Sequence, residues 1–378
     1  MEHPFKDIEK ILVIKLRHIG DVLLTVPVFR ALKETFPNAR ISALVNKGTE
    51  DVLTDNPIIE EIITYDRRIK EKPLFRRYAG EVGFLRGIWE RRFDMTIDLT
   101  GGDRGAITSF LSRARYRIGW ESQKGFIGKK HLYTHLFKPD GKRHMVLQNL
   151  DVIRSFGIST DNLSIEIFIP DDARNLIKEM ILKNNLKRPI IHIHPTSRWL
   201  FKCWKDEYMA EVIEWLLARG ASVIVTSSPD EREIRKVKNI LSMLKVSGSS
   251  LLDLSGKTSI KQLAAISEAS DLFLGVDSAP MHIAAAVGTT VIALFGPSSP
   301  NSWGPWDNNN LKGKSMLQSQ SKEGFGIHRV IQKDWECVPC GKDGCNGTKI
   351  SNCLYDIKPE EVIAVLFSKL TKQWGFSR

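Results

Sequence analysis

The sequence predicts an α/β protein built from two doubly wound parallel sheets. Short apolar runs alternate with amphipathic helical segments, the alternation pauses near residues 159–170 and then restarts, and polar motifs follow several of the apolar runs. At 378 residues, 42% hydrophobic and 26% charged, the chain has room for two or three globular domains. We expect a domain over residues 1–180, a second over 181–358, and a final helix within 359–378 that crosses back to the first domain.

The individual elements follow from the pattern in order. In the first half, we expect strands over 10–15, 39–45, 94–99 and 116–118 and helices over 21–36 and 75–92. In the second half, we expect strands over 189–194, 221–226, 271–275 and 290–295 and helices over 206–219, 230–244, 259–269, 280–287 and 359–374. In open parallel sheets, ligands bind outside the carboxyl ends of the strands, so the loops after the strands are the candidate functional segments.

The charge of the chain is concentrated in one region. Lys and Arg number 55 against 44 Asp and Glu, a formal net charge of +11. Residues 67–143 alone hold 19 basic and 8 acidic residues, so the rest of the chain sums to zero. Such a region suits a phosphorylated substrate, an anionic lipid surface or a nucleic acid, although no nucleic-acid motif is visible and no such partner is expected.

The sequence gives no sign of export or of membrane insertion. The first residues are polar without an apolar signal core, and no uninterrupted run of about 18 apolar residues exists. Five cysteines are too few for a disulfide scaffold at this length. A cytoplasmic location is therefore the default expectation.

The loop after the first strand carries the first motif, Arg17-His18-Ile19-Gly20-Asp21. Asp21 lies near the start of a predicted helix, where an aspartate often caps the helix. Alternatively, its carboxylate acts as a general base that takes the proton of an acceptor hydroxyl.

A second motif follows the strand that opens the second half. Thr196 and Ser197 precede Lys202, and hydroxyls and an ammonium suit the oxygens of a diphosphate. The same residue types are also typical of a basic surface loop.

The third motif runs from Gly275 to Thr289. Asp277 ends a strand, Ser278 and Ala279 are small, and Pro280 opens a helix whose N–H groups can bind an anion. Asp277 either binds a sugar hydroxyl or holds the loop. His282 on the first helical turn either faces a phosphate or satisfies a buried carbonyl.

Three further segments carry weaker signals. Glu231 follows a strand-to-helix loop where it could meet ribose hydroxyls, and Lys257 and Thr258 lie in a similar loop, although both loops also suit simple helix capping. Near the C-terminus, four cysteines fall within seventeen residues, at Cys337, Cys340, Cys345 and Cys353. They are either four reduced thiols or the ligands of a structural zinc ion.

Together the motifs resemble the ADP-heptose:lipopolysaccharide heptosyltransferases of glycosyltransferase family 9, closest to the branch called lipopolysaccharide heptosyltransferase III. The resemblance covers nearly the whole chain. It rests on residues 14–21 with 24–27, on 194–197 with 201–204, and on 275–280 with 282–285. It implies a GT-B fold, in which two Rossmann-like domains face a central cleft.

The resemblance also implies roles for individual residues. Asp21 corresponds to the catalytic base, and Lys202 assists departure of the diphosphate. The donor-binding positions of the family fall on Thr196, Ser197, Glu231, Lys257, Thr258, Asp277, Ser278, Ala279 and His282. The implied reaction is an inverting transfer of L-glycero-D-manno-heptose from ADP-heptose to a heptose hydroxyl of the lipopolysaccharide inner core, with no cofactor required for catalysis.

An acceptor of this kind fits the basic region. We expect acceptor contacts from Arg17, His18, Arg104, Arg113 or Lys124, and peripheral association with the inner face of the cytoplasmic membrane. Helix 75–92 interleaves cations and aromatics, which is typical either of an interfacial helix or of a solvated one. The alternatives are a transferase of the same family with another nucleotide sugar or acceptor position, and a basic membrane-binding protein without catalysis.

Overall fold

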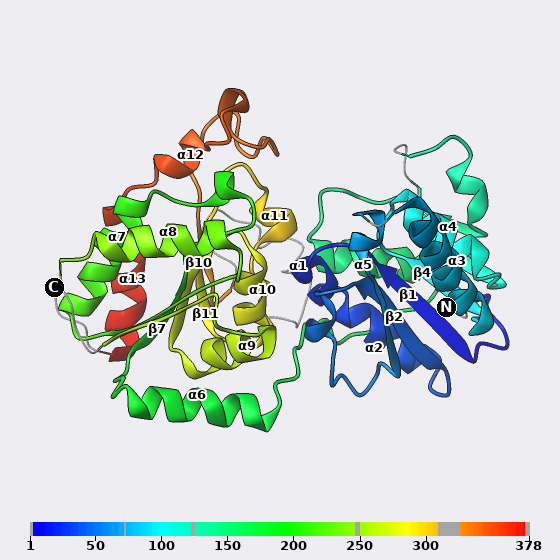
Figure 1. The fold of residues 1–378 in the computed structure, drawn as a ribbon, viewed down its shortest axis with the longest axis horizontal. Helices are drawn as coiled ribbons and strands as arrows, with labels where there is room; N and C mark the ends of the chain where they lie inside the picture. Colours follow the sequence, from blue (N-terminus) through cyan, green and yellow to red (C-terminus); the bar gives the residue numbers. More distant parts are fainter. Residues whose placement is uncertain (1–2, 72, 122–124, 246–249, 309–325, 375–378) are drawn as a thin grey trace. The chain divides into compact units, whose positions relative to one another are not determined.

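A computed structural model describes residues 3–71, 73–121, 125–245, 250–308 and 326–374 (Figure 1). The chain divides into two compact units, Met1–Phe168 and Ile169–Arg378. Each unit contains one six-stranded parallel sheet within the described ranges.

The sheet of the first unit has the order β3-β2-β1-β4-β5-β6, and all of its neighbouring strands are parallel. This is the doubly wound order of a Rossmann-like domain, in which the connections reverse direction between β1 and β4. The central strands β1 and β4 are buried on both faces. In β1, residues 11–14 are all apolar, as expected of a strand covered on both sides, whereas β4 also buries Thr96 and Asp98. The strands are β1 (Lys10–Lys15), β2 (Arg40–Asn46), β3 (Glu61–Tyr65), β4 (Met95–Asp98), β5 (Tyr116–Trp120) and β6 (His135–Phe137).

Helices cover both faces of this sheet. Helix α2 contacts α5, and α3 contacts α4 on the other face. The predicted helix 21–36 is two helices, because Leu24 and Thr25 depart from the helix and Pro27 lies in the first turn of the second one. The helices are α1 (Ile19–Leu23), α2 (Val26–Thr35), α3 (Leu74–Glu90), α4 (Asp103–Leu111) and α5 (Met145–Arg154), with 3-10 helices η1 (Glu50–Val52), η2 (Arg67–Glu71) and η3 (Lys129–Leu132).

The second unit repeats the topology of the first. Its sheet has the order β12-β11-β10-β7-β8-β9, again entirely parallel, with the reversal between β7 and β10. The prediction of two Rossmann-like domains is therefore confirmed. The strands are β7 (Ile190–His194), β8 (Ser222–Ser227), β9 (Leu251–Ser255), β10 (Leu272–Val276), β11 (Thr290–Leu294) and β12 (Arg329–Ile331).

Alternate residues of the second sheet pack into two separate apolar cores. Leu272 and Leu274 of β10 join a core that includes residues of α7, α8 and α13. Phe273, between them, packs with Met281 of α10 on the other face. The helices are α6 (Asp171–Lys183), α7 (Asp206–Ala218), α8 (Glu231–Ser242), α9 (Ile260–Ala269), α10 (Ala279–Ala286), α11 (Pro300–Trp303), α12 (Asn352–Tyr355) and α13 (Pro359–Trp374), with 3-10 helices η4 (Leu200–Lys202) and η6 (Cys345–Gly347).

The units divide between Phe168 and Ile169, before the expected boundary at residue 180. The reason is that α6 packs against α9 and so belongs with the second sheet. Helix α13 packs against α7 of the same unit. A return of the final helix to the first domain stays a prediction.

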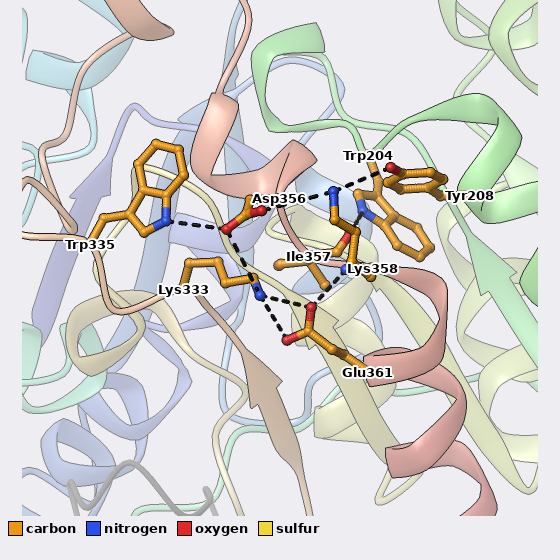
Figure 2. Close-up of polar contacts among 8 residues, drawn as sticks. All are labelled: Trp204, Tyr208, Lys333, Trp335, Asp356, Ile357, Lys358 and Glu361. Atoms are coloured by element: carbon orange, nitrogen blue, oxygen red, sulfur yellow. Dashed lines mark hydrogen bonds and ion pairs between the residues drawn. The ribbon is translucent and has the colours of Figure 1, made fainter.

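The segment before α13 braces the loop that follows β7. The buried Trp204 donates from Nε1 to the carbonyl of Ile357 at 3.0 Å, and Lys358 Nζ lies 3.4 Å from the hydroxyl of Tyr208 (Figure 2). Lys333 and Glu361 form an ion pair beside them at 2.8 Å. These contacts fix the end of the loop that contains Lys202.

Candidate functional site

The predicted motifs lie at equivalent places in the two units. Asp21 follows β1, next to the point where the first sheet reverses between β1 and β4. Lys202 follows β7, and Asp277 follows β10, on the two strands that flank the reversal in the second sheet. Doubly wound sheets bind their ligands outside the strand ends at such a reversal.

Asp21 lies in the first turn of α1 and is partly exposed. His18 holds the N-cap position, and its side chain makes no capping hydrogen bond. The structure therefore does not support the interpretation of Asp21 as the cap. Among the described residues, no donor reaches the Asp21 carboxylate within hydrogen-bond distance, so its oxygens are available to a hydroxyl.

A buried lysine lies beneath this loop. Lys15 Nζ donates to the carbonyl of Leu99 at 2.9 Å and to Asn149 Oδ1 at 3.0 Å. Burial lowers the pKa of Lys15 to about 8, and the nearby Asp21 carboxylate opposes that shift. Asn149 in turn donates to the carbonyl of Leu24, just after α1. The pair of Lys15 and Asn149 thus holds the short helix that carries Asp21.

A buried carboxylate supports the neighbouring loop after β4. Asp98 Oδ2 accepts from the Tyr133 hydroxyl at 2.6 Å, and Oδ1 accepts from the Thr100 N–H at 2.8 Å. Burial raises the pKa of Asp98, and the hydrogen bond from Tyr133 acts against that rise. Gly105 lies so close to this carboxylate that a Cβ atom would collide with it. The α4 helix therefore packs tightly over the end of β4.

In the second unit, the structure brings the predicted catalytic lysine into contact with one of the predicted donor-binding residues. Lys202 Nζ donates to Asp277 Oδ2 at 2.6 Å, although the residues are 75 positions apart. Asp277 is buried, and Lys202 is partly exposed. The ion pair holds the Lys202 ammonium in place at the carboxyl ends of β7 and β10.

The N-terminus of α10 lies directly after this aspartate. Ser278 is the N-cap, but its side chain makes no capping bond and donates instead to the carbonyl of Val276. The helix begins at Ala279, with Pro280 in its first turn, and His282 is buried on it. The backbone N–H groups and the positive end of the helix dipole can therefore meet an anion.

The two hydroxyls before Lys202 have different surroundings. Thr196 is fully buried and donates to Glu233 Oε2 at 2.7 Å, so its hydroxyl is engaged inside the unit. Ser197 Oγ accepts from the backbone N–H of Trp199 at 3.3 Å, which leaves its own proton available. A donor-binding role for the Thr196 side chain stays a prediction.

A chain of buried polar groups lies beneath the second site, and the sequence motifs did not predict it. The His192 ring contacts Ser267 at 2.9 Å and Thr226 at 2.8 Å, and His194 contacts the same Thr226 hydroxyl at 2.9 Å. Burial lowers the pKa of His194 to about 3 and that of His192 well below its ordinary value. Two histidines at alternate positions of one strand share a face, and that spacing could have indicated the chain.

A comparison with protein families decides what the chain is. Residues 83–329 match the model of glycosyltransferase family 9 (heptosyltransferase). The chain is also 31% identical over 300 residues to lipopolysaccharide heptosyltransferase 3 of Escherichia coli, covering 79% of this chain and 86% of that protein. The chain belongs to glycosyltransferase family 9. It is therefore a glycosyltransferase, as the sequence motifs indicated.

Other members of glycosyltransferase family 9 match over greater lengths. Lipopolysaccharide heptosyltransferase 2 of Salmonella typhimurium is 24% identical over 96% of this chain and 99% of its own length. A family 9 structure from Veillonella parvula superposes with a TM-score of 0.77 at 22% identity, over 97% of this chain and 98% of that one. An E. coli heptosyltransferase solved with ADP gives a TM-score of 0.68 at 17% identity, over 95% and 99%. The structural similarity shows the GT-B fold of the family.

The family 9 resemblance placed three more residues near the adenosine. Glu231 is exposed in the first turn of α8, and Asp230 caps that helix. Lys257 donates to the carbonyl of Asp253 at 3.1 Å. The Thr258 hydroxyl is buried, and the described part of the chain offers it no hydrogen-bond partner. Such an orphan group is expected where a ligand completes the hydrogen bonding.

The predicted acceptor residues do not form one cluster. Arg17 donates to the carbonyl of Thr100 at 3.0 Å, near Asp21, and His18 is exposed beside it. Arg104 donates to both carboxylate oxygens of Glu81 on α3, at 2.7 and 3.0 Å.

Arg113 lies apart from the loop after β1. Arg113 precedes β5, so it lies at the amino edge of the sheet, opposite Asp21; its guanidinium carbon is 5.7 Å from the centre of the Trp89 ring. A role for Arg113 in acceptor binding stays a prediction. Lys124 lies outside the described residues.

The structure does not support the zinc interpretation of the cysteine cluster. Within the described ranges, no group of three or more His, Cys, Asp or Glu side chains could hold a metal ion. Cys337 and Cys340 are exposed while Cys353 is buried in α12, and all of these thiols, with Cys345, are free. Burial raises the pKa of Cys353.

Proposed function

We propose that the chain transfers L-glycero-D-manno-heptose from ADP-heptose to a heptose hydroxyl of the lipopolysaccharide inner core. The single observation that carries the proposal is the ion pair of Lys202 with Asp277 at the reversal point of the second sheet. A cation fixed beside a helix N-terminus is suited to a nucleoside diphosphate. The choice of sugar is based on similar proteins: E. coli heptosyltransferase structures carry ADP and ADP-2-deoxy-2-fluoro heptose.

The donor binds to the second unit in this proposal. The diphosphate lies against Lys202, Ser197 and the N–H groups at Ala279, while Asp277 and His282 face the sugar or the phosphates. Thr258 donates its unpartnered hydroxyl toward the adenosine, with Lys257 and Glu231 nearby on their loops. Thr196 and Ser278 shape the loops around the phosphates.

The chemical step is an inverting displacement at the anomeric carbon. The acceptor oxygen attacks this carbon while its proton passes to the Asp21 carboxylate. The bond from the anomeric carbon to the diphosphate oxygen breaks, and the electron pair leaves with ADP, so the β-linked donor becomes an α-linked product. Lys202 and the α10 N-terminus stabilise the charge that develops on the leaving group.

The acceptor determines the expected location. An inner-core acceptor is attached to a lipid, so we propose that the protein works in the cytoplasm as a peripheral protein of the inner membrane face. Among the described residues, no helix is long and apolar enough to cross a membrane. Arg17 and His18, next to Asp21, are the residues we propose to bind the acceptor.

Transfer assays with a donor panel test the proposal. The purified chain is incubated with a heptose-bearing core acceptor and with ADP-heptose, a UDP-sugar or a GDP-sugar, and the product is analysed by mass spectrometry and NMR. We expect one α-linked heptose from ADP-heptose alone. Transfer from another nucleotide sugar would assign a different donor, and no transfer to any heptose acceptor would refute the acceptor class.

A further inference from the structure

Helix α3 presents a row of apolar side chains to solvent. Its inward side packs through Phe84 and Ile88 against the core of the first unit. On its outward side, five large side chains are exposed. Their exposed fractions are 68% for Leu74, 84% for Phe75, 66% for Tyr78, 64% for Val82 and 46% for Trp89. We name these five residues the α3 stripe.

The spacing of the α3 stripe makes it continuous. Leu74, Tyr78, Val82 and Trp89 are separated by four, four and seven positions, which places them on one line along a helix, and Phe75 lies beside its start. Helix α4 packs next to α3 (Figure 1) and adds Ile107, Phe110 and Leu111, all partly exposed. An apolar surface of this extent marks an interaction site on a soluble domain.

The charge around the α3 stripe is strongly positive. The segment 67–143, which contains α3 and α4, carries the whole excess charge of the chain, 19 basic against 8 acidic residues. Arg76 and Arg77 are exposed on α3 itself. Arg86 on α3 and Arg68 on η2 are exposed as well, paired with Glu90 and Asp66. A second copy of the chain would bring two such regions together, and their repulsion disfavours it. An anionic surface complements the region instead.

The start of the α3 stripe lies at the edge of the sheet that carries Asp21. Helix α3 follows β3, so Leu74 and Phe75 lie toward the carboxyl ends of the strands. Arg67 connects the two features, because its guanidinium donates to the carbonyl of Leu16, at the end of β1, at 3.1 Å. A surface that binds the α3 stripe would thus be close to the proposed base.

We propose that the α3 stripe and the cations around it bind an anionic phospholipid bilayer, with α3 lying in the interface. Aromatic and aliphatic side chains enter the headgroup boundary, and the arginines contact lipid phosphates. The proposal deepens the proposed function, on which it rests for the lipid-linked acceptor. It names the face of the molecule that meets the membrane.

Vesicle binding by the full chain tests this inference. Sedimentation is measured with phosphatidylcholine vesicles and with vesicles that also contain phosphatidylglycerol. The test variant is Leu74→Ser with Phe75→Ser. The matched control is Leu176→Ser with Leu182→Ser, which removes two exposed leucines, at 41% and 66% exposure, from α6 of the second unit. Circular dichroism and thermal melting confirm that both variants fold.

We expect binding to the anionic vesicles that weakens as salt rises. The affinity of the test variant for these vesicles should fall at least about tenfold, and the control should bind like the original chain. Equal affinities of the two variants, or no preference for anionic vesicles, would overturn the proposal. So would a stripe variant that changes the oligomeric state in sedimentation velocity but not vesicle binding, because the stripe would then bind a second copy.

Transfer to a deacylated, water-soluble core acceptor separates this inference from the proposed function. The stripe variant should transfer heptose to that acceptor at the original rate, since Leu74 and Phe75 have no role in the chemistry. If the original chain does not transfer at all, the proposed function fails and the vesicle result still stands. If transfer is normal but vesicle binding is absent, only the docking surface is wrong.

Discussion

The two units share one topology but place oppositely charged side chains at the reversal of their sheets. At the reversal of the first sheet, the Asp21 carboxylate receives no hydrogen bond from the described residues and lies near a buried cation, Lys15. At the reversal of the second, a cation, Lys202, is held by a carboxylate above two buried histidines with strongly lowered pKa values. In the proposed function, the strand order determines where each ligand binds, and a few loop residues determine whether a site takes a proton or binds a diphosphate.

The largest expected effect comes from removing the carboxylate of the first unit. Asp21→Asn should reduce the transfer rate about a thousandfold, because an amide cannot accept the acceptor proton. Single-turnover transfer measures it. The control is Asp103→Asn, which changes another first-turn aspartate of the same unit, on α4. A loss of equal size in the control would contradict a specific role for Asp21.

Removing the cation of the second unit should mainly affect nucleotide binding. Lys202→Ala should raise the Kd for ADP on the order of thirtyfold, since a charge-assisted contact to the diphosphate is lost. Isothermal titration calorimetry gives the value. Lys205→Ala is the matched control, because that lysine lies in the same loop but contacts the Tyr208 ring at 4.7 Å. Similar losses for both lysines would indicate a general charge effect.

The buried histidines of the second unit predict a particular pH dependence. Because the folded-state pKa values lie below the ordinary value of 6.5, the unfolded chain binds more protons as the pH falls. The free energy of unfolding should therefore decrease from about pH 6.5 toward pH 3, by about 2 kcal/mol per histidine between pH 7 and pH 5.

Urea unfolding at both pH values checks this prediction in the original chain and in His194→Gln. Between pH 7 and pH 5, the free energy of unfolding should fall about half as far in the variant as in the original chain, whatever the stability of the variant at pH 7. An unchanged pH dependence in His194→Gln would show that other groups cause the decrease.

The smallest expected effect concerns the adenosine side of the second unit. Thr258→Val removes a buried hydroxyl that lacks a partner in the described structure, so the free protein should be as stable or slightly more stable. The same change should weaken ADP binding by a few-fold. Thermal melting with and without ADP measures both. A destabilised free protein with normal ADP binding would place the Thr258 hydroxyl in the fold and not in the site.

Much of the fold was predictable from periodicity. The central strands, such as 10–15 and 290–295, are continuous apolar runs because both of their faces are covered. Strands β3, β6, β9 and β12 were missed because they lie at or next to the sheet edges, where their residues are only partly buried. A local pattern does not identify such strands, since their pairing depends on distant segments.

The site was predictable only in part, for the same reason. Motif positions identified Asp21, Lys202 and Asp277 individually, but the contact between Lys202 and Asp277 spans 75 positions and depends on the neighbouring strands β7 and β10. Arg104 was predicted to contact the acceptor, and the sequence did not indicate its ion pair with Glu81 on α3. The charge of a residue is visible in the sequence, whereas its partner is decided by the packing.

The most direct test of the account measures ADP affinity and transfer together in Asp21→Asn and Lys202→Ala. The account places the base in the first unit and the diphosphate in the second. It predicts that Asp21→Asn binds ADP with the original Kd and fails in transfer, while Lys202→Ala binds ADP weakly. If Asp21→Asn instead loses ADP binding, or Lys202→Ala keeps it, the assignment of the two chemistries to the two units is wrong.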